Sequence, residues 1–325
     1  MNSPDIELVR KRFGENPLLF ELIPPEIDAP EKTVQNRHDK LQKLFSRVEV
    51  SGINIPEIRE ESAKDDDGKR RSDFKPRVAP RKYVRKLREK FDTNFVICRV
   101  VVHLPAARQE EWLLETSKDY NISNIVLVGG EKEAEAYDGL SVPEGNRLIK
   151  QQLNRGKTEY GEKNISPTNY LVGNISIASR RLDTLDEPER ITYKIKHGAD
   201  FFYTQIIEEP DSPIKLLEDL SPKLKEENID PPFFFWSFAP IASQKDVDFM
   251  RWLGVKIPKK VEDRILTSPE PAEESRRWNL EIFEKLKQAN QKLPVSCPLG
   301  VNISFMGDRN FDNAVKLAES FKNNF

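Results

Sequence analysis

Short apolar runs alternate with amphipathic stretches along most of this chain of 325 residues. The runs are rich in β-branched and aromatic residues, which is typical of buried strands, and most are followed by apolar residues at helical spacing. Strands are predicted at residues 17–25, 48–54, 94–104, 124–131, 169–177, 198–209, 232–240 and 299–305. This alternation, without a break in composition, predicts one (β/α)8 TIM barrel over residues 1–325, with a doubly wound parallel sheet as the alternative.

The run at residues 198–209 is the strongest candidate for a functional strand. A turn glycine, Gly198, opens it, and its last polar member, Gln205, stands near its C-terminal end, before an acidic loop closed by Pro210. Barrel enzymes keep their chemistry at that end of the strands. A buried strand with one hydrogen-bonded polar residue would show the same pattern, so the run alone does not decide.

Polar residues at the ends of other runs add candidates. Glu21 stands inside the first apolar run, where a charged carboxylate is costly to bury, so we expect it to be protonated or to have a dedicated partner. His103 ends the run at 94–104, although a single histidine more often has a structural role. Gly129 and Gly130 precede Glu131, and glycines at a strand end let a ligand approach the backbone. They form no dinucleotide or P-loop fingerprint.

Residues 56–90 interrupt the alternation after the second strand. Blocks of acidic and basic side chains at residues 64–72 precede a segment rich in arginine and proline at 74–81. Either a self-neutralising loop or a basic lid that recruits an anionic ligand is consistent with this charged insert.

Composition excludes several classes of function. Lys+Arg 52 against Asp+Glu 54 gives a net charge of −2 and a pI of about 6.1, so no global field attracts nucleic acid or an anionic membrane. Cys98 and Cys297 lie far apart without a CxxC partner, which argues against a metal site and a disulfide framework. Without a signal peptide or a long apolar segment, we expect a cytoplasmic protein.

Four stretches, in order, resemble the methylenetetrahydrofolate reductase family, which is a flavin-dependent (β/α)8 barrel. Residues 20–25 are similar to its Phe-Glu-(aromatic/apolar)2-Pro-Pro motif, and residues 125–131 lie where it has an apolar strand leading into Arg-Gly-Asp. Residues 194–205 resemble its Lys-x-x-Ala-Gly-Ala-(x)3-Ile-Thr-Gln motif. Residues 255–261 match its apolar-x-Ile-Pro segment, and the resemblance spans about residues 18–305.

On the substrate side, the resemblance implies that Glu21 is the general acid. It would protonate a nitrogen of the folate imidazolidine ring so that a reactive iminium forms, which suits a carboxylic acid in an apolar strand. Gln205 corresponds to the glutamine that hydrogen-bonds the pterin, for which a neutral amide offers both a donor and an acceptor.

On the cofactor side, the resemblance implies bound FAD and NAD(P)H as the electron donor. Lys194 corresponds to a lysine of the flavin site, Glu187 to an aspartate of that site, and Glu131 to the acid near the flavin ring. His103 is the fourth residue that we expect to bind a cofactor.

The sequence departs from the family mainly on this cofactor side. Gly129 replaces an arginine, Asn174 and Ile175 stand where a Tyr-Pro pair is common, and Gln244 replaces a phenylalanine. Residues 52–54, Gly-Ile-Asn, replace Tyr-Gly-Ala. Hydride transfer through flavin and direct transfer from the nicotinamide are therefore both open.

The function implied by the resemblance is reduction of 5,10-methylenetetrahydrofolate to 5-methyltetrahydrofolate. One alternative is a non-catalytic pterin-binding or regulatory subunit. Another is a different one-carbon barrel enzyme, such as a methyltransferase or lyase, because one barrel fold hosts many chemistries. A folate substrate is the expected partner, and both a homo-oligomer and a partner subunit are compatible with the sequence.

Overall fold

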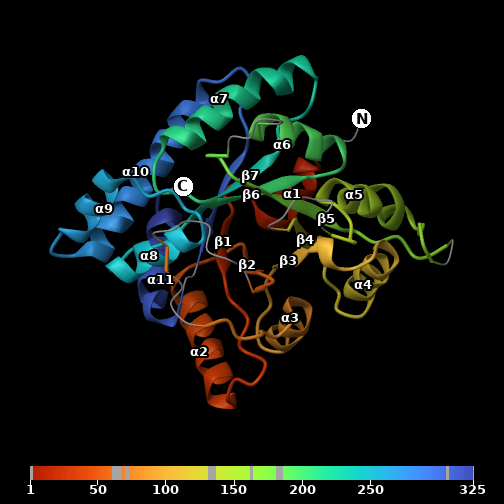
Figure 1. Cartoon of the computed structure of the whole chain (residues 1–325), viewed down its shortest axis with the longest axis horizontal. Coiled ribbons are helices and arrows are strands. Elements are labelled where there is room, and N and C mark those ends of the chain that lie inside the picture. The colour runs from red at the N-terminus through yellow and green to blue at the C-terminus, as the bar shows by residue number, and fades with distance from the viewer. Residues whose placement is uncertain are drawn as a thin grey trace.

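The computed structural model describes residues 3–60, 68–69, 73–130, 137–161, 164–180, 186–304 and 307–324. Its centre is a closed barrel of parallel strands in the order β1 to β8 (Figure 1). The strands are β1 (Leu18–Glu21), β2 (Gly52–Ile55), β3 (Phe95–Val100), β4 (Asn124–Val128), β5 (Leu171–Ser176), β6 (Phe201–Ile206), β7 (Phe233–Phe238) and β8 (Leu299–Ile303). Because β1 also pairs with β8, the sheet closes. The predicted (β/α)8 barrel is confirmed.

Helices surround the strands (Figure 1). They are α2 (Glu31–Arg47), α3 (Pro80–Arg88), α4 (Ala106–Lys118), α5 (Val142–Arg147), α6 (Glu187–Lys196), α7 (Asp211–Glu226), α8 (Gln244–Trp252), α9 (Lys259–Leu266), α10 (Pro271–Gln291) and α11 (Phe311–Lys322). Short irregular turns follow α5, namely η3 (Leu148–Gln152) and η4 (Leu153–Arg155), and η5 (Asp308–Asn310) precedes α11. Within the described residues, no helix is both long enough and apolar enough to cross a membrane.

The third strand ends earlier than the sequence pattern predicts. The apolar run at residues 94–104 forms β3 only as far as Val100 and then the 3-10 turn η1 (Val101–His103). The backbone N–H of Val100 donates to a carboxylate oxygen of Glu57 at 2.8 Å. A side chain therefore takes the donor that would have continued the backbone ladder to a neighbouring strand.

A helix that the apolar pattern did not reveal, α1 (Ile6–Phe13), closes the N-terminal end of the barrel. Phe13 packs with the buried side chains of the barrel lumen. Arg12 donates to the carbonyl oxygens of Ser123 at 2.8 Å and Asn169 at 2.6 Å, just before β4 and β5 begin. The segment before β1, which looks polar in the sequence, thus forms a helix that caps the N-terminal end of the barrel.

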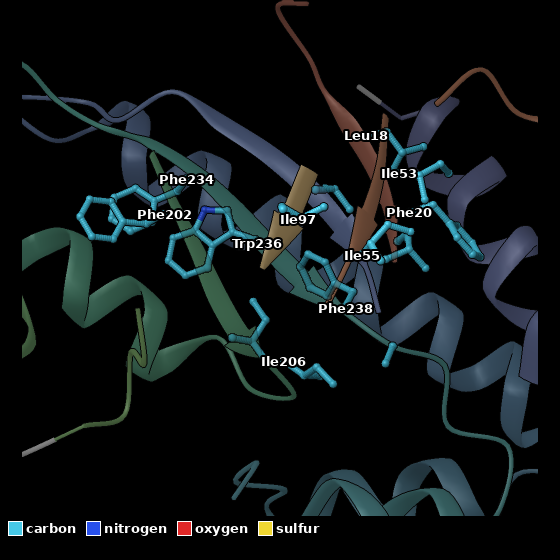
Figure 2. Packing of buried hydrophobic residues seen from close by; sticks show 14 of the residues in the cluster. Leu18, Phe20, Ile53, Ile55, Ile97, Phe202, Ile206, Phe234, Trp236 and Phe238 are labelled. Carbon is cyan, nitrogen blue, oxygen red and sulfur yellow. The ribbon is translucent and has the colours of Figure 1, made fainter. Parts of the chain in front are cut away.

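Aromatic residues of β6 and β7 fill both faces of the barrel wall. The lumen face carries Phe201, Tyr203, Phe233 and Phe235. On the outer face the rings of Phe202 and Phe234 stack with centroids 5.6 Å apart, and Trp236 stacks on Phe234 at 5.3 Å (Figure 2). On β5, a Cβ atom at Gly173 would lie 2.3 Å from the Phe201 ring, so only glycine leaves room for this packing.

The described part of the charged insert is held to the rest of the protein at two points. Glu26 and Arg77 form an isolated antiparallel bridge, which ties the end of the insert to the loop after β1. Lys69 donates its backbone N–H to the carbonyl of Asp248 in α8 at 2.9 Å. The insert therefore reaches from β2 to the helix that follows β7. Most of its acidic and basic block, residues 61–67 and 70–72, lies outside the described residues.

Candidate functional site

Polar side chains gather at the C-terminal ends of the strands, on the lumen side of the wall. Side chains alternate along a strand, so residues two apart face the same side. Leu19 belongs to the lumen cluster, which puts Glu21 above it on β1. On β3 Cys98 follows Val96 in the same way. The lower lumen is apolar, and hydrogen-bonding groups begin one layer higher.

Glu21 is half-buried at the last position of β1. The amide nitrogen of Asn54, the neighbouring residue on β2, lies 3.4 Å from one of its carboxylate oxygens. The amide oxygen of Asn54 in turn accepts from the Cys98 thiol at 3.5 Å. Asn54 is only 2 % exposed, so it fixes one side of Glu21 from inside the wall.

The Cys98 thiol and the Tyr203 phenol keep their protons. Burial raises the pKa of Cys98, and the negative charges of Glu21 and Glu57 raise it further. Burial likewise raises the pKa of Tyr203 well above its usual range, and Cys98 and Glu21 add to that shift. The Tyr203 hydroxyl, which is buried, has no hydrogen-bond partner among the described residues. It is a donor without an acceptor.

Asn302 contributes a second open position on β8, the strand that lies between β7 and β1. Its amide nitrogen lies 3.1 Å from the hydroxyl of Ser237 on β7 and 3.3 Å from that of Ser304. Its amide oxygen is buried and has no partner within the described part of the chain. Buried polar groups are normally paired, so an orphaned acceptor in a lumen marks a place where a ligand or water can bond.

Gln205 lies near the end of β6, half-buried, where the pairing with β7 is irregular. Its amide nitrogen donates to the carbonyl oxygen of Leu253, which follows α8, at 2.8 Å. This bond fixes the side chain, and the amide oxygen has no hydrogen bond to the residues that the structure describes.

Lys194 and Glu187 form a second group outside the lumen, around the end of β5. The Lys194 ammonium donates to the carbonyl of Ile175 at 2.7 Å, and its side chain is largely buried. Burial lowers the pKa of Lys194 to about 8, although the charge of Glu187 opposes the shift. Glu187 is fully buried, accepts the backbone N–H of Ile177 at 2.9 Å and pairs with Arg180 at 3.3 Å.

His103 lies on a third part of the same face. It is exposed, and its ring meets that of Tyr137 edge-on with centroids 5.2 Å apart. Burial of the ring nitrogens and the positive charge of Arg59 lower its pKa, whereas Glu57 acts in the opposite direction. Glu131, the remaining candidate, lies outside the described residues.

The candidates that lie within the described residues therefore share one end of the barrel but fall into separate groups. Glu21 and Gln205 line the mouth, Glu187 and Lys194 lie close together beside β5, and His103 lies apart from both pairs, against Tyr137.

The polar lumen residues Asn54, Tyr203, Ser237 and Asn302 were not singled out from the sequence. Each occupies an every-second position in an apolar strand, and that spacing is the one signal that could have revealed them.

The fold and site together define a (β/α)8 barrel with an apolar lumen and a polar C-terminal mouth. No protein-family model and no curated protein sequence matches the chain. Among solved structures, an uncharacterised protein from Clostridium thermocellum that binds two copies of 5-methyl-5,6,7,8-tetrahydrofolic acid has a TM-score of 0.76 at 17 % identity. The match covers 98 % of this chain and 99 % of that one.

Other solved structures have lower TM-scores. The spore cortex-lytic enzyme SleL of Bacillus cereus has a TM-score of 0.49 at 12 % identity, over 94 % of this chain and 74 % of that one. Phosphoribosyl anthranilate isomerase of Thermococcus kodakaraensis has a TM-score of 0.44 at 12 % identity, over 95 % and 100 %. At 17 % identity, the likeness to the Clostridium thermocellum protein shows the fold alone.

Proposed function

We propose that the chain binds a reduced folate at the mouth of its barrel and reduces 5,10-methylenetetrahydrofolate to 5-methyltetrahydrofolate with NAD(P)H. The observation that carries the proposal is the placement of Glu21, a half-buried carboxyl group at the lumen end of β1 that is held by Asn54. The likeness in fold to a Clostridium thermocellum protein that binds 5-methyl-5,6,7,8-tetrahydrofolic acid supports the same ligand class.

Glu21 supplies the proton in this reaction. Transfer of its proton to N10 of the bound folate breaks the bond between N10 and the bridging carbon, which leaves a cationic iminium at N5. A hydride from the reduced nicotinamide then adds to that carbon, giving the methyl group and the oxidised nicotinamide. One proton and one hydride are consumed, and general acid catalysis of this kind contributes roughly 10²–10⁴-fold in rate.

The neutral amides of the mouth orient the pterin. The amide nitrogen of Gln205 is bound to Leu253, so its oxygen is the atom that accepts from a ring N–H or amino group. The unpaired amide oxygen of Asn302 offers a second acceptor. Acceptors placed at fixed positions suit the donor-rich edge of a pterin, and they add no charge to the lumen.

The residues that the family resemblance assigns to flavin binding form hydrogen bonds and ion pairs within the protein. Lys194 is bound to the carbonyl of Ile175, and Glu187 holds Ile177 and Arg180. To contact a flavin phosphate, the buried Lys194 would have to leave its carbonyl partner. The described residues on this side do not fit a flavin, and we therefore favour direct hydride transfer from the nicotinamide.

A second candidate is a non-catalytic folate-binding subunit. The hydrogen bonds of Lys194 and Glu187 within the protein favour this candidate, because they remove two expected contacts to a cofactor. The residues expected to bind folate, Glu21 and Gln205, keep their places at the mouth. Such a subunit would bind 5-methyltetrahydrofolate without turning over the methylene form.

Three measurements on the purified protein separate these readings. Calorimetric titration with 5-methyltetrahydrofolate tests binding, oxidation of NADH or NADPH with 5,10-methylenetetrahydrofolate tests turnover, and the absorbance spectrum tests flavin. Flavin bands would refute direct transfer. Binding without turnover with either donor would favour the subunit, and absence of folate binding would contradict both proposals.

Glu21→Gln tests the acid. The amide keeps the size of the side chain and can still contact Asn54, so we expect folate binding to persist while turnover falls roughly 10²–10⁴-fold. Circular dichroism of the variant provides the control for folding. A variant with unchanged turnover would remove Glu21 from the mechanism.

A further inference from the structure

A cavity of about 360 Å³ opens beside the first half of α2, apart from the barrel lumen. This volume lies within the range of small-molecule sites, roughly 300–1,000 Å³. The cavity is lined by Thr33, Asn36, Arg37, Asp39 and Lys40.

The lining offers mainly cations and hydrogen-bond donors. One guanidinium nitrogen of Arg37 donates to the carbonyl of Ile23, which fixes the group, while its buried Nε–H has no partner in the described part of the chain. Lys40 adds a second positive charge. The carboxylate of Asp39 already accepts from Gln35 at 2.8 Å. A fixed guanidinium, an ammonium group, a hydroxyl and an amide suit an anion with carboxylate groups.

The cavity lies on the same face of the barrel as Glu21. Helix α2 starts directly after the loop that leaves β1, so its first half is at the C-terminal end of the strands. The Lys40 ammonium lies 5.5 Å from the centre of the Phe311 ring. Phe311 packs edge-on against Phe20 at 5.9 Å, and Phe20 precedes Glu21. A short series of contacts thus joins the cavity to the strand that carries the acid.

We infer that this cavity binds the carboxylates of the glutamyl tail of the folate. The inference rests on the proposed folate binding and extends it to the other end of the ligand. A pterin placed at Glu21 must let its tail leave the mouth across the rim, and the tail ends in two carboxylates. Among the rim elements, α2 presents Arg37 and Lys40 on one helical face, where their two positive charges attract the carboxylates of the tail.

Lys40→Gln tests the inference by comparing two ligands. Calorimetric titration would measure the affinity for 5-methyltetrahydrofolate and for 5-methyltetrahydropteroate, which has the same pterin but no glutamate. Loss of one partly exposed charge should weaken the glutamyl ligand about three- to tenfold and leave the pteroate unchanged. Lys40→Arg, which keeps the charge, should restore most of the difference.

Lys43→Gln is the matched control. Lys43 lies one turn further along α2, is not part of the cavity lining and pairs with Asp312 at 2.7 Å, so its loss should change neither affinity. Asn36→Asp adds a second test, because Asn36 is exposed and a negative charge in the cavity should weaken the glutamyl ligand alone.

The outcomes separate the inference from the function on which it rests. If wild-type protein binds both ligands with equal affinity, or if Lys40→Gln weakens both equally, the tail does not lie in this cavity while folate binding stands. If wild-type protein binds neither ligand, the proposed function fails as well. A selective loss of the glutamyl ligand in Lys40→Gln and Asn36→Asp, but not in Lys43→Gln, would support the inference.

Discussion

The Glu208→Gln variant should have a higher free energy of unfolding than the wild-type protein, and the difference between the two should grow as the pH rises. Glu208 follows β6 and is 1 % exposed, and neither of its carboxylate oxygens has a hydrogen-bond partner among the described residues. Burial raises its pKa well above the usual range. The folded protein therefore holds this carboxyl group in its neutral form, whereas the unfolded chain loses the proton above a pKa of about 4.3.

The magnitude follows from proton linkage. Between the unfolded and the folded pKa, the folded state binds one proton more than the unfolded state, so the free energy of unfolding falls by about 1.4 kcal/mol for each pH unit. The stability that the neutral group permits is complete below the unfolded pKa and is lost as the pH rises towards the folded pKa. Two pH units on this slope amount to about 2.7 kcal/mol, and Glu208→Gln has no such slope.

Urea unfolding of both chains, followed by circular dichroism over a series of pH values from about 4 to about 7, measures the difference. At the lowest pH the two free energies of unfolding should nearly agree, because the acid and the amide are both neutral and similar in size. The gap should then widen in favour of Glu208→Gln. A gap that does not change with pH, or a variant that is less stable near neutrality, would show that Glu208 is ionised or paired in the folded protein.

Two further substitutions compare a buried phenol that has a hydrogen-bond partner with one that has none among the described residues. Tyr203→Phe removes a hydroxyl that lacks a partner, so the free energy of unfolding in urea should stay the same or rise by up to about 1 kcal/mol, and a clear loss would reveal a bond. Tyr170→Phe removes a hydroxyl that donates to the carbonyl of Leu113 at 2.7 Å and should cost about 1–3 kcal/mol in the same assay. Equal effects of the two substitutions would contradict the assignment of a partner to only one of them.

Local pattern was sufficient for the barrel because each strand shows its burial in its own residues. In α6, Glu187–Lys196, an N-cap residue, a proline in the first turn and apolar spacing all indicate a helix that starts where the structure has it. The helix α1 was missed because only Val9 and Phe13 are buried in it, and the lumen that receives them is built by distant strands.

The location of a site residue could be predicted where it depends on the position of the residue in a strand. It could not be predicted where it depends on partners that are distant in the sequence. Glu21 and Gln205 could be placed at strand ends from the apolar runs around them. For Lys194, the sequence showed a cation on a helix, but its burial depends on the carbonyl of Ile175 and on Glu187, which the fold brings together. The amide of Asn302 bonds through its nitrogen to Ser237 on β7, which the fold brings beside β8, so no local pattern could show that its oxygen is left without a partner among the described residues.

The docking of α1, the helix that caps the N-terminal end of the barrel, has a consequence for the order of folding. It precedes the rest of the barrel in the chain, yet Arg12 binds the carbonyls of Ser123 and Asn169, and the Asp5 backbone N–H donates to Asp200 at 3.0 Å. Those partners come more than 100 residues later, and contacts over such separations form slowly because a long loop must close first. During synthesis α1 must wait, undocked, until β4 and β5 have paired, so sealing of the barrel base is among the last steps of folding.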